Sequence, residues 1–116
     1  MKTLVIYHNP ACSNSRRALE LLRERDADFE IVEYLKNPPG REVLEGLLVN
    51  LELPAAELVR KDKRFEALGL KASDFAEPEN VVALLVEHPE LMQRPVVVRG
   101  NRAIIARPPE KLTALL

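Results

Sequence analysis

The chain has 116 residues, of which 47% are hydrophobic and 30% are charged. This length supports one domain with a hydrophobic core and is too short for two. Its 17 basic and 18 acidic residues give a net charge of −1, so no overall field favours nucleic acid or a membrane surface as a partner.

The apolar runs and the cysteine content bear on the compartment. No run of about 18 apolar residues, the length that spans a membrane, occurs in the sequence. The N-terminus also lacks the apolar core and cleavage site of a signal peptide. A single cysteine cannot form an internal disulfide, which suits the reducing cytoplasm. We therefore expect a cytoplasmic protein, and we expect it to be a monomer.

The first third of the chain predicts a strand, a helix and a second strand. Residues 3–7 are apolar and partly β-branched, as in a short buried strand. Between residues 15 and 25, four apolar side chains fall on one helical face: Ala18, Leu19, Leu21 and Leu22. Residues 29–34 alternate in polarity and predict a second strand. The short crossover between the two strands favours a parallel pair.

The middle third predicts a small helical subdomain, inserted at about residues 41–89. A stiff, proline-rich connection at residues 36–40 leads into it. Helical patterns then follow at residues 41–51, 55–59, near 65–68, and 79–87. Gly69 ends the third of these helices, Pro78 opens the last, and His88 is expected to cap it before Pro89.

The last third predicts a β-hairpin and a final helix. Residues 96–98 and 103–106 are apolar runs, and Gly100-Asn101 between them is a two-residue hairpin signal. Residues 110–116 predict a helix. The complete order is typical of a thioredoxin-like α/β fold, with a mixed four-stranded sheet in a single domain over residues 1–116. Such a pattern supports a fold and not a function.

The decapeptide at residues 8–17 joins the first strand to the first helix and contains the only cysteine, Cys12. Pro10 and a cluster of Asn and Ser favour a turn, with Ser13 or Asn14 as the expected N-cap. Unpaired backbone N–H groups and the helix dipole at such a turn lower the pKa of a thiol and bind anions. A buried structural thiol is the alternative, but no apolar periodicity includes Cys12. We expect a reactive thiolate.

His8 ends the predicted strand close enough to Cys12 to influence the ionisation of the thiol, although a buried histidine at the edge of the core is the alternative. The run His8-Asn9-Pro10-Ala11-Cys12, followed by Ser15-Arg16, resembles the active-site loop of the glutaredoxin-coupled arsenate reductases, the ArsC family. The resemblance extends over nearly the whole chain. It implies that Cys12 and His8 are catalytic and that Ser15 binds substrate.

Three arginines lie at the ends of predicted elements. From the residues alone, each could bind a tetrahedral oxyanion through its forked donors, or could be surface charge. The resemblance implies that Arg60, Arg94 and Arg107 bind arsenate. It also places Pro95 at the position of a cis-proline that lies against the active cysteine. The surface-charge interpretation is kept for the remaining basic residues of these segments: Lys61, Lys63, Arg64, Arg99 and Arg102.

The single cysteine limits the redox chemistry. Reduction of As(V) to As(III) takes two electrons, which two thiols supply when they form one disulfide. The residue three positions after Cys12 is Ser15, so the sequence by itself requires only that the second thiol is external. The resemblance implies glutathione as the co-substrate and glutaredoxin as the protein that resolves the mixed disulfide. We expect no metal and no bound cofactor.

Three functions other than arsenate reduction are alternatives for such a sequence. A phosphatase loop requires Cys-x5-Arg, but Ala18 occupies the arginine position. Transcription regulators of the same fold bind RNA polymerase and typically carry Cys-x-x-Cys, and Ser15 argues against that class. An ArsC-like, glutathione-linked thiol reductase that acts on another substrate is the alternative that the sequence leaves open.

Overall fold

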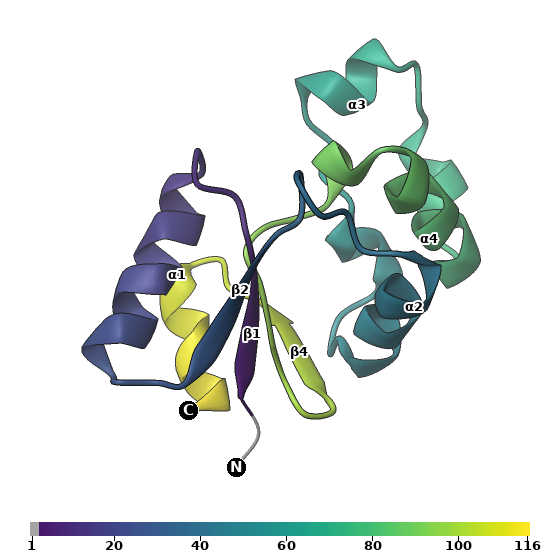
Figure 1. Cartoon of the computed structure of the whole chain (residues 1–116). Helices are drawn as coiled ribbons and strands as arrows, with labels where there is room; N and C mark the ends of the chain where they lie inside the picture. The colour runs from purple at the N-terminus through teal and green to yellow at the C-terminus, as the bar shows by residue number, and fades with distance from the viewer. Residues whose placement is uncertain (1–2) are drawn as a thin grey trace. The chain divides into compact units, whose positions relative to one another are not determined.

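Strand β1 (Leu4–His8) is an inner strand of a four-stranded sheet in the computed structural model, which describes residues 3–116. It pairs in parallel with β2 (Phe29–Glu33) and antiparallel with β3 (Val96–Arg99). Strand β4 (Arg102–Ile105) pairs antiparallel with β3, so the order is β2-β1-β3-β4 (Figure 1). The predicted thioredoxin-like α/β fold, with its mixed sheet and parallel first pair, is confirmed.

The sheet belongs to one of two units into which the chain divides. Two segments, Met1–Asn37 and Arg94–Leu116, form the unit that contains the sheet, which we call the sheet unit. The intervening segment Pro38–Gln93 forms a second unit, which we call the helical unit. The two segments of the sheet unit meet because β3, from the second, pairs with β1, from the first.

The end of β1 determines where the decapeptide starts. The strand runs one residue beyond the range 3–7 that the sequence predicted, so His8 is its last residue. His8 lies opposite Glu33, the last residue of β2. Since the two strands are parallel, Asn9 and Tyr34, which come next, leave the sheet at the same edge.

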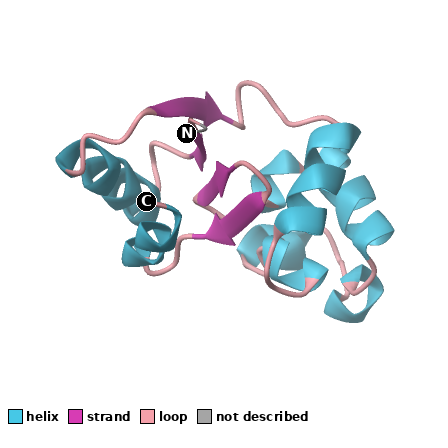
Figure 2. Cartoon of the chain, turned by 90° about the horizontal axis from the view of Figure 1, so that it is seen from below, coloured by secondary structure: helices cyan, strands magenta, loops and turns pink. Residues whose placement is uncertain are grey.

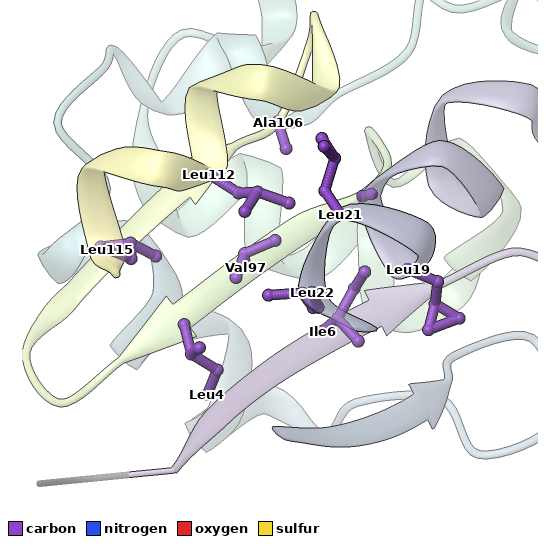
Figure 3. Packing of buried hydrophobic residues seen from close by; sticks show 10 residues of the cluster. Leu4, Ile6, Leu19, Leu21, Leu22, Val97, Ala106, Leu112 and Leu115 are labelled. Atoms are coloured by element: carbon purple, nitrogen blue, oxygen red, sulfur yellow. The ribbon is translucent and has the colours of Figure 1, made fainter. Parts of the chain in front are cut away.

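One face of the sheet is covered by α1 (Ser13–Glu24) and by η4 (Pro109–Leu115), a 3-10 helix that also packs against α1 (Figure 1). The predicted apolar stripe of α1 is buried against the strands and η4 (Figure 3). The buried cluster comprises Leu4, Ile6, Ala18, Leu19, Leu21, Leu22, Val97, Ala106, Leu112 and Leu115. Each large side chain buried there contributes about 1.5–3 kcal/mol. This packing holds the first turn of α1 at the end of β1.

The hairpin between β3 and β4 is the one predicted. Gly100 has a φ of 61°, which the first turn position of a type II′ hairpin requires. The helix predicted at residues 110–116 is η4, which is a 3-10 helix. Its short-range hydrogen bonds include the one from the Lys111 N–H to the Pro108 carbonyl at 3.0 Å.

The helical unit contains helices and, within its described residues 38–93, no strand (Figure 2). Its elements are α2 (Arg41–Asn50), η1 (Ala55–Leu58), α3 (Lys63–Ala67), η2 (Ala72–Phe75), α4 (Pro78–Glu87) and η3 (Pro89–Leu91). Helices α2 and α4 pack against each other. The sequence predicted every α-helix of this unit but neither η2 nor η3. No helix among residues 3–116 has the length and apolarity needed to cross a membrane.

The ends of α3 and α4 have local causes. Helix α3 begins before the predicted residue 65, because the Asp62 carboxylate accepts hydrogen bonds from the N–H groups of Arg64 and Phe65, each at 3.2 Å. Gly69, with a φ of 70°, ends it as predicted. His88 is the C-cap of α4, as expected, and its N–H donates to the Leu84 carbonyl at 2.7 Å.

Candidate functional site

Cys12 occupies the N-cap position of α1, with extended backbone angles, φ −96° and ψ 124°. The prediction that Ser13 or Asn14 caps the helix is therefore wrong. The helix starts at Ser13, one residue after the thiol, and no side chain caps it. The first N–H groups of a helix lack partners within the helix. The thiol of Cys12 thus lies where these donors are available.

Backbone hydrogen bonds hold the loop before Cys12 in one shape. The Cys12 N–H donates to the Asn9 carbonyl at 3.0 Å, and the Ala11 N–H donates to Asn9 Oδ1 at 2.9 Å. The second bond is the local side-chain contact by which Asn favours turns. Arg16 adds a third connection, since its Nη1 donates to the Pro10 carbonyl at 2.9 Å. The thiol is therefore presented by a fixed turn.

Several groups act on the ionisation of Cys12, which is a free, half-buried cysteine. Burial raises the pKa of the thiol, but the backbone N–H of Ser15, the Arg94 guanidinium and the backbone N–H of Asn14 together lower it further than burial raises it. The resulting pKa of Cys12 is below its ordinary value. Helix amides and a guanidinium stabilise a thiolate, and the same donors bind oxyanions.

His8 and Ser15 form a buried pair beside this loop. His8 Nδ1 and Ser15 Oγ are 2.6 Å apart, and Oγ also accepts the Asn9 N–H at 3.0 Å. Ser15 is fully buried and His8 is 7% exposed. Burial lowers the pKa of His8, against the opposing effect of Glu33. His8 is therefore mostly neutral at pH 7, and in the tautomer that carries its proton on Nε2, Nδ1 accepts the Ser15 hydroxyl proton.

This pair changes how the predicted roles of Ser15 and His8 are to be understood. The Ser15 hydroxyl is bound within the protein, so its contribution beside Cys12 comes from its backbone N–H. The His8 ring contacts Ser15, and through Ser15 it holds the turn that carries Cys12. Both residues are thus positioned to maintain the loop.

Arg94 and Arg107 lie together in the sheet unit, at the ends of β3 and β4. Arg94 directly precedes Pro95, and its guanidinium is close enough to the Cys12 thiol to lower the pKa of that thiol. Arg107 Nη1 donates to the Arg94 carbonyl at 2.8 Å. The Arg94–Pro95 peptide bond is cis, as the resemblance implies, and the Arg107–Pro108 bond, for which nothing was predicted, is also cis.

Arg60 belongs to the helical unit and has partners there. Its Nη1 donates to Gln93 Oε1 at 3.0 Å, and its Nε lies 3.3 Å from the Asp62 carboxylate. Its backbone N–H donates to the Leu91 carbonyl at 2.7 Å. These contacts hold Arg60 in place in the segment between η1 and α3.

Two residues of the site were missed by sequence reasoning. Asn9 shapes the turn, and its place in the quoted motif was the available signal. Tyr34 is fully buried and lies near Asn9 and Arg94. Its signal was an aromatic hydroxyl at the last position of the second predicted strand, residues 29–34, which in the structure already ends at Glu33. Within residues 3–116, no group of three or more His, Cys, Asp or Glu side chains is arranged to hold a metal ion.

Known proteins are similar to this chain over nearly its full length. The sequence model of the ArsC family matches residues 7–115. The "Uncharacterized protein YfgD" of Escherichia coli K12 is 40% identical over 117 residues, covering 99% of this chain and 98% of that protein. An arsenate reductase of Neisseria meningitidis serogroup A is 36% identical over 118 residues, covering 100% of each. The solved structure "Arsenate reductase from Vibrio cholerae" has a TM-score of 0.89 at 34% identity, covering 99% of this chain and 98% of that one.

Proposed function

Because the chain belongs to the ArsC family, we propose that it is an arsenate reductase with Cys12 as its nucleophile. The observation that carries the proposal is the position of this cysteine at the first turn of α1. There the amides of Asn14 and Ser15 and the Arg94 guanidinium all lower the pKa of the thiol. The same donors suit a tetrahedral oxyanion, so nucleophile and substrate-binding groups coincide.

The proposed reaction begins with arsenate bound as a dianion. The Cys12 thiolate attacks arsenic and forms an S–As bond, and one oxygen leaves as water after protonation. A second thiol then completes the two-electron reduction of As(V) to As(III). In balance, one arsenic acid and two thiols give one arsenous acid, one disulfide and one water. Cys12 supplies one of the two thiols.

The second thiol comes from outside the chain, which has one cysteine. We propose glutathione as this co-substrate, and glutaredoxin as the partner that resolves the mixed disulfide between Cys12 and glutathione. Both are thiol reductants of the cytoplasm, which is the compartment proposed for this protein. The chemistry needs one Cys12 per arsenate, and a monomer suffices for it.

The arginines are assigned to the oxyanion. For Arg94 the support is its proximity to the Cys12 thiol, and for Arg107 it is the hydrogen bond to the Arg94 carbonyl. For Arg60 the support is the resemblance. His8 maintains the Cys12 loop through Ser15. Pro95 follows Arg94 directly and sets the start of β3.

The test is arsenate-dependent oxidation of NADPH, coupled through glutathione reductase, glutathione and glutaredoxin. We expect turnover with all components, and none with the Cys12→Ser variant. Without any external thiol, the reduced protein should stop at a Cys12–arsenic adduct. Stoichiometric arsenite from the protein alone contradicts the external-thiol scheme. If turnover occurs with thioredoxin but not with glutaredoxin, the partner is thioredoxin. If arsenate-dependent turnover occurs with neither, the protein is better explained as a glutathione-linked reductase of another substrate.

The role of Arg60 has a matched control in Arg64, an arginine on the neighbouring turn whose Nε pairs with Glu90 at 3.0 Å. Arg60→Ala should lower kcat/KM about ten- to a hundredfold, the usual effect of losing a hydrogen bond to a charged group. Arg64→Ala should leave kcat/KM near the wild-type value. Equal losses in the two variants rule out the assignment of Arg60.

A further inference from the structure

Tyr34 comes directly after β2, at the edge of the sheet where the Cys12 loop begins. The register of the parallel pair brings His8 opposite Glu33, so Asn9 and Tyr34 follow at corresponding positions. The Tyr34 side chain is fully buried, at 0% exposure. The chain thus directs a phenol into the interior next to the loop that carries the thiol.

The hydroxyl of Tyr34 is buried, and no group of the described range 3–116 accepts its proton. The Asn9 and Arg94 side chains lie close enough to its oxygen to act on it as hydrogen-bond donors, which lowers the pKa of the phenol. Buried polar atoms are nearly always paired, and each exception needs an explanation. A phenylalanine fills the same volume without an unpaired hydroxyl, so packing alone does not account for the oxygen. The hydroxyl therefore points to a partner outside the protein.

The surroundings of Tyr34 define what that partner is. Burial raises the pKa of Tyr34, while Arg94 and Asn9 lie close enough to oppose this, so the phenol keeps its proton at neutral pH. A guanidinium has donors but no acceptor. Asn9 directs its Oδ1 to the Ala11 N–H at 2.9 Å and lowers the pKa of Tyr34 as a hydrogen-bond donor does, so it too offers the phenol no acceptor. What the O–H lacks is an acceptor, and Arg94 beside it favours one with negative charge.

We propose that Tyr34 is a substrate-binding residue, whose hydroxyl donates a hydrogen bond to an oxygen of the tetrahedral oxyanion bound by Arg94 beside Cys12. The identity of that oxyanion as arsenate rests on the proposed function. The hydroxyl and the guanidinium then contact the same anion from neighbouring positions. Binding of the anion supplies the acceptor that the buried hydroxyl lacks in the free protein.

Tyr34→Phe removes only the hydroxyl and tests the proposal directly. In a Cys12→Ser background, which cannot react, arsenate affinity measured by calorimetry should fall about tenfold or more, as expected for a hydrogen bond to a charged group. In the reactive protein, kcat/KM in the coupled assay should fall about ten- to a hundredfold. The melting temperature should stay equal or rise, because an unpaired buried hydroxyl has been removed.

Tyr7→Phe is the matched control, since Tyr7 is the other tyrosine of the chain and lies on β1. It should leave arsenate affinity and kcat/KM near the wild-type values. A titration of thiolate absorbance at 240 nm distinguishes two possible acceptors of the Tyr34 hydrogen bond, the bound anion and the Cys12 thiolate. If Tyr34→Phe raises the Cys12 midpoint but leaves arsenate affinity unchanged, the hydroxyl serves the thiolate and the proposal is overturned.

The outcomes also separate this inference from the proposed function. If the wild-type protein reduces arsenate, and Tyr34→Phe equals it in affinity and kcat/KM, the inference alone fails. If the wild-type protein does not reduce arsenate, but Tyr34→Phe weakens arsenate binding in the Cys12→Ser background, the proposed function fails and the inference holds. If the Cys12→Ser protein does not bind arsenate, the inference fails, and turnover by the wild-type protein alone decides the proposed function.

Discussion

Replacing Ser15 by alanine tests whether its hydroxyl holds the Cys12 loop. In the structure, Ser15 Oγ accepts the Asn9 N–H at 3.0 Å and lies 2.6 Å from His8 Nδ1. Ser15 is 0% exposed, His8 7% and Asn9 8%, so water cannot readily replace the lost partner. Ser15→Ala therefore leaves one buried donor and one buried acceptor without a hydrogen bond.

The expected loss of stability follows from these two atoms. Each unsatisfied buried group costs about 1–3 kcal/mol, and the better helix propensity of alanine returns about 0.5 kcal/mol. We expect Ser15→Ala to lower the free energy of unfolding by about 1.5–5.5 kcal/mol. An unfolding entropy of about 2.1 cal/mol/K per residue gives roughly 0.24 kcal/mol/K for a chain of this length, so the melting temperature should fall by about 6–23 °C.

Thermal and urea unfolding, followed by circular dichroism, measure this loss. Ser13→Ala is the matched control, because Ser13 is exposed at the start of the same helix and its replacement should change stability by at most about 0.5 kcal/mol. Activity should fall with Ser15→Ala as the turn around Cys12 loosens. If Ser15→Ala is no less stable than Ser13→Ala, the buried hydrogen bonds do not hold the loop.

Three further predictions concern the same site. Titration of thiolate absorbance at 240 nm, with Cys12→Ser as the blank, should give a Cys12 midpoint below the free-thiol value of about 8.5, because helix amides and Arg94 lower the pKa. Arg94→Ala should lower kcat/KM for arsenate about ten- to a hundredfold, while Arg102→Ala, at an exposed position, should not. Burial lowers the pKa of His8, so the unfolded chain binds the proton more readily. Stability from neutral His8 is fully present above about pH 6.5 and should be lost as the pH falls through the lower folded pKa.

Each of these has a result that contradicts it. A Cys12 midpoint at or above about 8.5 means that the thiol is not activated. Equal losses of activity in Arg94→Ala and Arg102→Ala mean that the loss is not specific to the position of Arg94. For His8, urea unfolding between pH 5 and 8 is compared with the His8→Gln variant. A pH dependence that is the same with and without the imidazole assigns the titration to other groups.

Features that depend on near neighbours along the chain could be predicted from the amino-acid sequence. The apolar stripe of α1 and the strand runs were readable because helices and strands repeat over a few residues. Gly69 and Gly100 marked turns because a positive φ suits glycine. Cys12 could be assigned to a helix start because it directly precedes the first turn. The exact cap was mistaken, since Ser, Asn and Cys in succession offer several starts for the same helix.

Contacts between side chains that are distant in the sequence depend on the complete fold. Arg94 and Tyr34 reach the Cys12 loop because β3 pairs with β1 on one side and β2 pairs with it on the other. The order and register of strands depend on packing across the whole sheet, which no local pattern encodes. Likewise, the resemblance implies that Ser15 binds substrate, and only the fold shows that its hydroxyl contacts His8 and Asn9. Local periodicity determines where the helices and strands form. The chemistry of the site depends on which ends of these helices and strands lie close together.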